Sequence, residues 1–242
     1  MKKAMFVLSI AVNIVLMLVV YNAYVLHLGV RTEIEKLFGL KKAERAAHVK
    51  LTYESNPRYL SKLSLYDVNI QRNANIVMLG DSITENAAWN ELMNRSDIAN
   101  MGIGSDVTAG FLNRLDYVYK LNPEICFMLG GINDMCLQMR VKDIFDNYKN
   151  IVLGLKSHNI IPVIQSVTYT ANPTLNNDVK ELNKLLKRFA KDNNVDYIDL
   201  NSALSENELL RPEYTYDGTH LTGKGYAIWR DEIDKILKKY NL

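Results

Sequence analysis

The stretch Ile76-Val77-Met78-Leu79-Gly80-Asp81-Ser82-Ile83-Thr84 decides the fold. It begins with four apolar residues and turns polar at a glycine, a pattern typical of a short buried strand that ends in a loop. Further apolar runs follow at 98–101, 125–129, 162–164 and 197–200. Between and after them, apolar residues recur with helical spacing at 109–121, 141–155, 178–191 and 221–240. Strands that alternate with helices predict a parallel sheet covered by helices on both faces.

The composition is that of a globular protein. The chain has 242 residues, of which 48% are hydrophobic and 23% charged, and this excludes a disordered chain. The net charge of +2 is too small to indicate a nucleic-acid partner. Cys126 and Cys136 have neither the spacing of a metal site nor that of a disulfide framework, so we expect no metal and no disulfide.

The N-terminal residues predict a membrane anchor. Residues 4–30 contain no Asp, Glu, Lys or Arg. A helix of that length is long enough to cross a hydrocarbon core of about 30 Å. We therefore expect a transmembrane anchor at 1–30, a stalk and lead-in segment at 31–73, and a globular domain at 74–242. A cleaved signal peptide is the alternative, although no Ala-x-Ala site follows Val20.

The charges around this run do not decide its orientation. Lys2 and Lys3 precede it and favour a cytoplasmic N-terminus. Basic residues that favour the reverse orientation follow it, namely Arg31, Lys36, Lys41, Lys42 and Arg45. Because the N-terminal tail is very short, we expect an extracytoplasmic domain, in the periplasm or at the cell surface.

Three of the predicted strand ends carry candidate functional residues. Ser82 follows the first strand, at the carboxyl edge of the sheet where ligand sites form in such folds. Gly102 follows the second strand, and a glycine there lets a backbone amide approach a ligand closely. Asn133 follows the third strand and has a side-chain amide that can stabilise an oxyanion. For each of them, a turn or helix-capping residue is the structural alternative.

A fourth candidate is the segment Asp217-Gly218-Thr219-His220 near the C-terminus. Residues three apart on a helical turn face the same way. Asp217 can therefore accept a hydrogen bond from one imidazole nitrogen of His220 while the other nitrogen faces a nucleophile. A loop histidine paired with a nearby carboxylate is the alternative. The remaining histidines, in the apolar run, the stalk and a helix end, are weaker candidates: His27, His48 and His158.

Together, these segments resemble the four sequence blocks of the SGNH (GDSL-like) hydrolases. The blocks occur in the family's order and spacing, over about residues 75–240, as Gly80-Asp81-Ser82-Ile83, Gly102, Gly131-x-Asn133-Asp134 and Asp217-x-x-His220. Ile83 stands where the family usually has leucine. The surroundings of Trp89, Asp106 and Arg114 are similar to the branch of platelet-activating-factor acetylhydrolase-like and sialate O-acetylesterase-like enzymes. A Gly-x-Ser-x-Gly elbow, the mark of the larger α/β-hydrolase fold, is absent from the sequence.

The resemblance implies a fold and a mechanism. The fold is a three-layer α/β/α sandwich like flavodoxin, with strand order 2-1-3-4-5. The mechanism uses Ser82 as nucleophile, His220 as its base and Asp217 to orient the imidazole. The oxyanion is expected to meet the backbone amides of Ser82 and Gly102 and the side chain of Asn133. No metal or other cofactor is implied.

The substrate is less constrained by the sequence. The resemblance implies a small-molecule or glycan ester with a small acyl group, acetyl first, on a carbohydrate such as a sialic acid or a cell-wall glycan. A lysophospholipid or thioester is the second hypothesis, and an inactive membrane-tethered glycan-binding protein is the third. The candidate substrate-binding residues are Asp81, Trp89 and Tyr216, since aromatic rings near the blocks can stack on a sugar. Packing of the surrounding loops is the alternative for the aromatic side chains.

Overall fold

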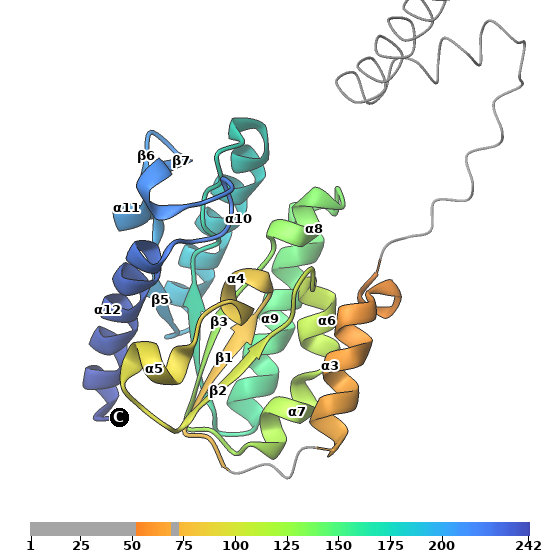
Figure 1. Ribbon diagram of the computed structural model, residues 1–242. Helices are drawn as coiled ribbons and strands as arrows, with labels where there is room; N and C mark the ends of the chain where they lie inside the picture. The colour runs from red at the N-terminus through yellow and green to blue at the C-terminus, as the bar shows by residue number, and fades with distance from the viewer. Residues whose placement is uncertain (1–51, 69–72) are drawn as a thin grey trace, which may run out of the picture. The chain divides into compact units, whose positions relative to one another are not determined.

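A computed structural model describes residues 52–68 and 73–242 (Figure 1). The expected membrane anchor at 1–30 lies outside these residues, as do residues 31–51 and 69–72 of the expected stalk and lead-in segment. Within the described residues, no helix is both long and apolar enough to cross a bilayer.

The centre of the molecule is a parallel sheet of five strands in the order β2-β1-β3-β4-β5, which is the order that the family resemblance implies. Its strands are β1 (Ile76–Gly80), β2 (Ile98–Gly102), β3 (Ile125–Leu129), β4 (Ile161–Gln165) and β5 (Asp196–Ile198). All residues of β1 and β3 are buried, as expected of strands covered on both faces. Gly80 pairs with both Gly102 and Leu129, so β1, β2 and β3 end together at one edge of the sheet.

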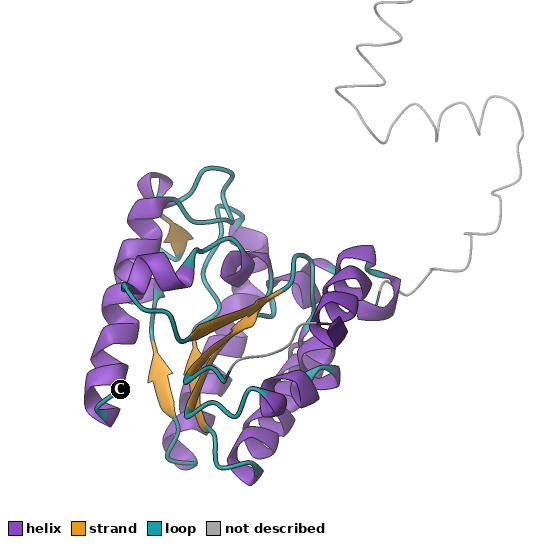
Figure 2. Cartoon of the chain, turned by 60° about the horizontal axis from the view of Figure 1, so that its bottom comes forward, coloured by secondary structure: helices purple, strands orange, loops and turns teal. Residues whose placement is uncertain are grey.

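Helices cover both faces of the sheet and complete three layers (Figures 1 and 2). Helix α9 packs beside α6, α7 and α10 on one face, and α5 packs beside α12 on the other. The longer helices are α3 (Pro57–Val68), α9 (Val141–Ser157), α10 (Pro173–Asp192) and α12 (Gly223–Tyr240). Short helices lie between them, namely α4 (Ser82–Glu85), α5 (Trp89–Met93), α6 (Thr108–Asn113), α7 (Leu115–Lys120), α8 (Ile132–Cys136) and α11 (Asn201–Leu204), with the 3-10 turns η1 (Tyr53–Ser55) and η2 (Pro212–Tyr214). A small hairpin, β6 (Ser205–Glu206) and β7 (Leu209–Leu210), precedes η2.

The predicted helix at 109–121 is two helices, because the chain bends at Arg114. The backbone of Arg114 leaves helical geometry at φ −109° and ψ 17°. Its side chain is fully buried and donates hydrogen bonds to the carbonyl oxygens of Met101 (2.7 Å) and Gly80 (3.0 Å) and to the carboxylate of Asp106 (2.9 Å). The apolar spacing that predicts one helix gives no sign of this buried arginine.

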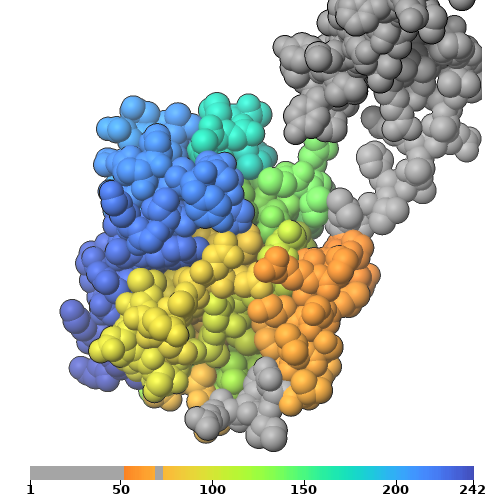
Figure 3. Space-filling model, viewed as in Figure 1, coloured from red at the N-terminus to blue at the C-terminus, as the bar shows by residue number. Residues whose placement is uncertain are grey.

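Residues 57–68, which the sequence places in the lead-in segment, form helix α3 against the sheet domain. Tyr59 is buried and its hydroxyl donates to the carbonyl oxygen of Gly110, 3.1 Å away. The side chain of Asn56 donates to the carbonyl oxygen of Gly104 at 2.9 Å. The space-filling view shows α3, in orange, in direct contact with the yellow-green segments (Figure 3). Helix α3 thus lies beside the loop that follows β2.

Candidate active site

Ser82 lies at the carboxyl edge of the sheet because β1 turns directly into α4. Asp81 caps this short helix, with its Oδ1 accepting a hydrogen bond from the amide of Ile83 at 2.9 Å. The cap holds the turn closed and leaves Ser82 partly accessible at the first position of the helix. Within the described residues, no acceptor pairs with the backbone amide of Ser82.

The loop before α12 presents His220 and Asp217 as one unit. Oδ1 of Asp217 accepts hydrogen bonds from the amides of Thr219 (2.9 Å) and His220 (2.8 Å), so the carboxylate is fixed by the loop backbone. Its Oδ2 lies 2.6 Å from Nδ1 of His220. This contact fixes the ring so that Nε2 points away from the loop.

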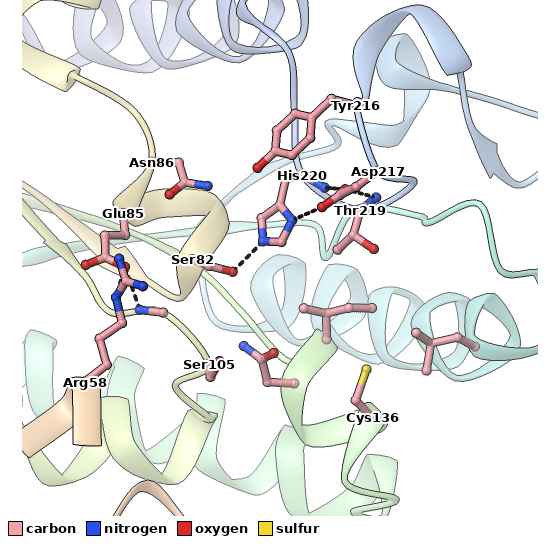
Figure 4. Close-up of a pocket in the computed structure, with 14 residues that line it drawn as sticks. Arg58, Ser82, Glu85, Asn86, Ser105, Cys136, Tyr216, Asp217, Thr219 and His220 are labelled. Atoms are coloured by element: carbon pink, nitrogen blue, oxygen red, sulfur yellow. Dashed lines mark hydrogen bonds and ion pairs between the residues drawn. The ribbon is translucent and has the colours of Figure 1, made fainter. Parts of the chain in front are cut away.

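Ser82 and His220 meet across the sheet edge although they are far apart in sequence. Oγ of Ser82 lies 2.9 Å from Nε2 of His220 (Figure 4). The three side chains therefore form a continuous hydrogen-bonded series from hydroxyl to imidazole to carboxylate. Such a series can move a proton from a nucleophilic hydroxyl to a base.

The electrostatics of the site favour an ionised Asp217. Partial burial acts to raise the pKa of its carboxyl group, but hydrogen bonds from the backbone and the ring of His220 outweigh this and lower the pKa below its ordinary value. A charged carboxylate beside Nδ1 stabilises the imidazolium that forms when Nε2 accepts a proton.

Asn133 reaches the same cavity from α8, the short helix after β3. Its Nδ2 donates one hydrogen bond to the carbonyl oxygen of Asp106, 2.9 Å away. An amide nitrogen carries two hydrogens, so this bond fixes the side chain and leaves the second hydrogen for a ligand. Asn133 lines the cavity together with Ser82 and His220.

Gly102 does not meet the expectation of an oxyanion donor. Its amide donates to Oδ1 of Asn100, 2.9 Å away, and Gly102 does not line the cavity. The reason for a glycine here is close packing, since a Cβ atom would lie 2.2 Å from the backbone nitrogen of Glu85.

Ser105, in the same loop, lines the cavity where Gly102 does not. It lies near Ser82, and its backbone has a left-handed φ of 60°. Within the described residues, no acceptor pairs with its amide. The run Gly102-Ile103-Gly104-Ser105 signals a tight loop, but no feature of the sequence indicates which of its residues line the cavity.

The expected substrate-binding residues divide into two groups. Asp81 is 0% exposed and Trp89 is 2% exposed, so neither contacts a ligand in the cavity. Trp89 belongs to the core, with its ring 4.8 Å from that of Trp229 and its Nε1 donating to the carbonyl oxygen of Thr84. Tyr216 is 65% exposed, lines the cavity and stacks on His220 with a ring-centroid distance of 5.8 Å.

The cavity has a volume of about 370 Å³ and two chemically different ends. Charged and polar side chains from Arg58, Glu85 and Asn86 line one end, and Cys136 lies at the other, with Ser82 between them (Figure 4). Ile132 and Leu175 also line the cavity. Among the residues that the structure describes, no cluster of His, Cys, Asp and Glu could hold a metal ion. The volume suits a small-molecule ligand.

The family is decided by a sequence profile. The profile of the GDSL-like Lipase/Acylhydrolase family matches residues 78–228, more than half of the chain. The chain belongs to this family. The family is named for lipase and acylhydrolase activity, and the resemblance to SGNH hydrolases is confirmed.

Solved structures share the fold of the GDSL-like hydrolase. A GDSL-like lipase from Bacteroides thetaiotaomicron superposes with a TM-score of 0.67 and is 24% identical, with coverage of 75% of this chain and 98% of that one. A catalytic mutant of an acetylxylan esterase from Geobacillus stearothermophilus gives a TM-score of 0.59 at 16% identity, covering 69% and 94% of the two chains.

A curated relative extends the comparison. An N-acylneuraminate cytidylyltransferase of Streptococcus agalactiae serotype V is 27% identical over 180 residues, which are 71% of this chain. The match covers 42% of that relative's length, so the GDSL-like hydrolase corresponds to less than half of it.

Proposed function

We propose that Ser82, His220 and Asp217 form the catalytic triad of a serine esterase that removes small acyl groups, acetyl first, from carbohydrate esters. The observation that carries the proposal is the hydrogen-bonded series, 2.9 Å from Ser82 Oγ to His220 Nε2 and 2.6 Å from His220 Nδ1 to Asp217 Oδ2.

The chemistry follows from this geometry. Oγ of Ser82 attacks the ester carbonyl carbon while Nε2 of His220 takes the hydroxyl proton. The carbonyl oxygen becomes an oxyanion, and the backbone amides of Ser82 and Ser105 and the second hydrogen of Asn133 Nδ2 stabilise it. The imidazolium then gives its proton to the leaving alcohol oxygen. Water attacks the acyl-enzyme by the same route, which releases the carboxylic acid and restores Ser82.

The cavity supports a small acyl group on a polar alcohol. Ile132, Cys136 and Leu175 suit a short acyl chain, whereas the opposite polar end and the exposed ring of Tyr216 suit a sugar. The names of two similar proteins support an acyl ester of a carbohydrate as the substrate. One is an N-acylneuraminate cytidylyltransferase, and the other is an acetylxylan esterase. The expected third hypothesis, an inactive glycan-binding protein, is disfavoured by the family and by the intact hydrogen-bonded series.

A panel of esters tests this function. Purified protein should hydrolyse p-nitrophenyl acetate and an O-acetylated N-acylneuraminate, and its rate should fall as the acyl chain of the p-nitrophenyl ester lengthens. Ser82→Ala should lower kcat by about 10⁴-fold or more on every ester cleaved. A preference for long-chain esters or lysophospholipids over acetyl esters would replace the carbohydrate esterase with a lysophospholipase of the same fold.

We also propose that the apolar stretch 4–30 anchors the chain in a membrane, with the esterase domain on the extracytoplasmic side. Digestion of intact cells by an added protease should remove the esterase domain if this is correct. Protection in intact cells and digestion only after lysis would place the domain on the cytoplasmic side.

A further inference from the structure

Arg58 brings a positive charge to the cavity from outside the matched family region. It lies on α3, whereas the family profile begins at residue 78. Its side chain is 63% exposed and lines the polar end of the cavity (Figure 4). Helix α3 is held against the domain through the buried Tyr59, so the position of Arg58 is fixed by packing.

Glu85 sets the orientation of Arg58. Oε2 of Glu85 accepts a hydrogen bond from the amide of Gly104 at 2.8 Å and lies 3.0 Å from Nε of Arg58. The arginine side chain lies directly over the loop, since a Cβ atom on Gly104 would be 2.9 Å from Cδ of Arg58. The carboxylate thus pairs with the Nε edge of the guanidinium, and within the described residues no hydrogen bond uses the Nη atoms.

The charges at this end of the cavity do not cancel. Lys62 also pairs with Glu85, at 3.1 Å, so two cations share one carboxylate that is only 10% exposed. Among the described lining residues, Arg58 is the one side chain that is positively charged at every pH of interest. An accessible guanidinium edge with spare donors is suited to bidentate binding of a planar anion.

We propose that Arg58 is a specificity-determining residue that binds an anionic group, a carboxylate, on the alcohol part of the ester. The inference rests on the proposed function, in which the acyl group occupies the Cys136 end of the cavity and the alcohol part therefore faces Arg58. The natural substrate is then the acyl ester of an acidic sugar. A phosphate group on a sugar or on glycerol is the other anion that Arg58 could bind in the same way.

The test compares matched esters that differ only in charge. One pair is an O-acetylated N-acylneuraminate and its carboxamide, and the other is an acetylated sugar phosphate and the same acetylated sugar without phosphate. In the wild type, kcat/KM for the acid should exceed that for the neutral partner by about tenfold, mainly through KM. In Arg58→Gln this ratio should fall close to one. The pair of esters whose ratio falls in Arg58→Gln shows whether Arg58 binds a carboxylate or a phosphate.

Lys62→Gln is the matched control, because it removes the other cation from Glu85 without touching the cavity. It should keep a ratio well above one, because Arg58 still offers its Nη donors to the anion. If Arg58, Lys62 and Glu85 have only a structural role, both variants should instead lower kcat/KM equally for all esters. A ratio that is the same in wild type and Arg58→Gln for both pairs overturns the proposal.

A second readout does not depend on which hydroxyl carries the acetyl group. Free N-acylneuraminate should inhibit hydrolysis of p-nitrophenyl acetate competitively, and more strongly than its carboxamide, in the wild type but not in Arg58→Gln. Equal inhibition by acid and amide in the wild type also overturns the carboxylate assignment. Two other results would instead reject the proposed esterase mechanism. One is a wild-type protein that does not hydrolyse p-nitrophenyl acetate, and the other is a Ser82→Ala variant that still hydrolyses it.

Discussion

Asn133 and Asp106 join two segments of the site through one hydrogen bond, from Nδ2 of Asn133 to the carbonyl oxygen of Asp106 at 2.9 Å. The bond ties helix α8 to the loop after β2, and Ser105 lies directly before Asp106 in that loop. Two groups that we assign to oxyanion stabilisation, the Asn133 amide and the Ser105 backbone, are therefore held relative to each other before substrate binds. Such preorganised donors stabilise developing charge strongly.

Asn133→Ala should lower kcat on p-nitrophenyl acetate by about 10²–10³-fold, because it removes an oxyanion donor. Steady-state kinetics measure this directly. Asn193→Ala, which removes an exposed side-chain bond to the carbonyl oxygen of Phe189, is the control and should leave kcat unchanged. An Asn133→Ala enzyme with wild-type kcat would remove this residue from the oxyanion site.

Arg114→Ala should destabilise the fold by about 3–5 kcal/mol, since it leaves the buried carboxylate of Asp106 without its partner. Equilibrium unfolding in urea gives the change in the free energy of unfolding. The control is Arg140→Ala, where the arginine side chain is 79% exposed and pairs with Asp143 on a helix surface. That variant should leave the free energy of unfolding nearly unchanged, because solvent screens an exposed ion pair. Equal losses in the two variants would contradict the structural role of Arg114.

Asp81→Asn should change how stability depends on pH. Burial raises the pKa of the Asp81 carboxyl from 3.8 to about 7, despite the hydrogen bond from the amide of Ile83. Between these two pKa values, Asp81 keeps its proton in the folded protein but has lost it in the unfolded chain. The contribution of Asp81 to stability is therefore fully present below the pKa of the unfolded state, and it is lost as the pH rises through the pKa of the folded state. The stability of wild type relative to Asp81→Asn should therefore fall between about pH 4 and pH 7.

Urea unfolding of both proteins at a series of pH values checks this difference. The buried carboxyls of Asp106 and Asp134 also have a raised pKa, caused first by burial, and their charges contribute to the raised pKa of Asp81, so the difference between the two proteins includes this coupling. Asp143→Asn is the control. The hydrogen bond from Arg140 lowers the pKa of Asp143, so the stability of wild type relative to Asp143→Asn should rise with pH and not fall. A wild-type advantage over Asp81→Asn that grows with pH would contradict the assignment.

Alkylation of Cys136 should inhibit the enzyme, because this exposed thiol lines the cavity and a bulky maleimide would occupy the proposed acyl end. Partial burial raises its pKa, so modification should be faster at alkaline pH. Cys126 is fully buried and should not react in the folded protein. Activity should be lost in step with modification, and Cys136→Ser should stay active and resistant. Full activity after complete modification of Cys136 would argue against the acyl site.

The sheet and the core of the site follow from local sequence. The apolar runs predict all five strands of the central sheet, and the family resemblance predicts their order. Ser82, Asp217 and His220 are also predictable, since each lies at a strand end or in a short turn whose geometry depends on neighbouring residues. Oγ of Ser82 and Nε2 of His220 lie 2.9 Å apart because the fold brings their segments together at the carboxyl edge of the parallel sheet.

Other parts of the site depend on packing that a single sequence does not reveal. Trp89 and Asp81 have the chemistry of ligand-binding residues but are buried by the helices around them. That Ser105 and not Gly102 lines the cavity depends on the path of the loop after β2, where Ser105 has a left-handed φ. Arg58 reaches the cavity only because α3 docks against the domain, a tertiary contact with no local signal.

The central claim, that Ser82 is a nucleophile activated by His220, is tested most directly by the site and rate of labelling with a fluorophosphonate probe. The account predicts one adduct, on Ser82, that is absent from Ser82→Ala and forms about 10³-fold more slowly or worse in His220→Ala. An adduct on another residue, or an unchanged labelling rate in His220→Ala, would contradict the claim.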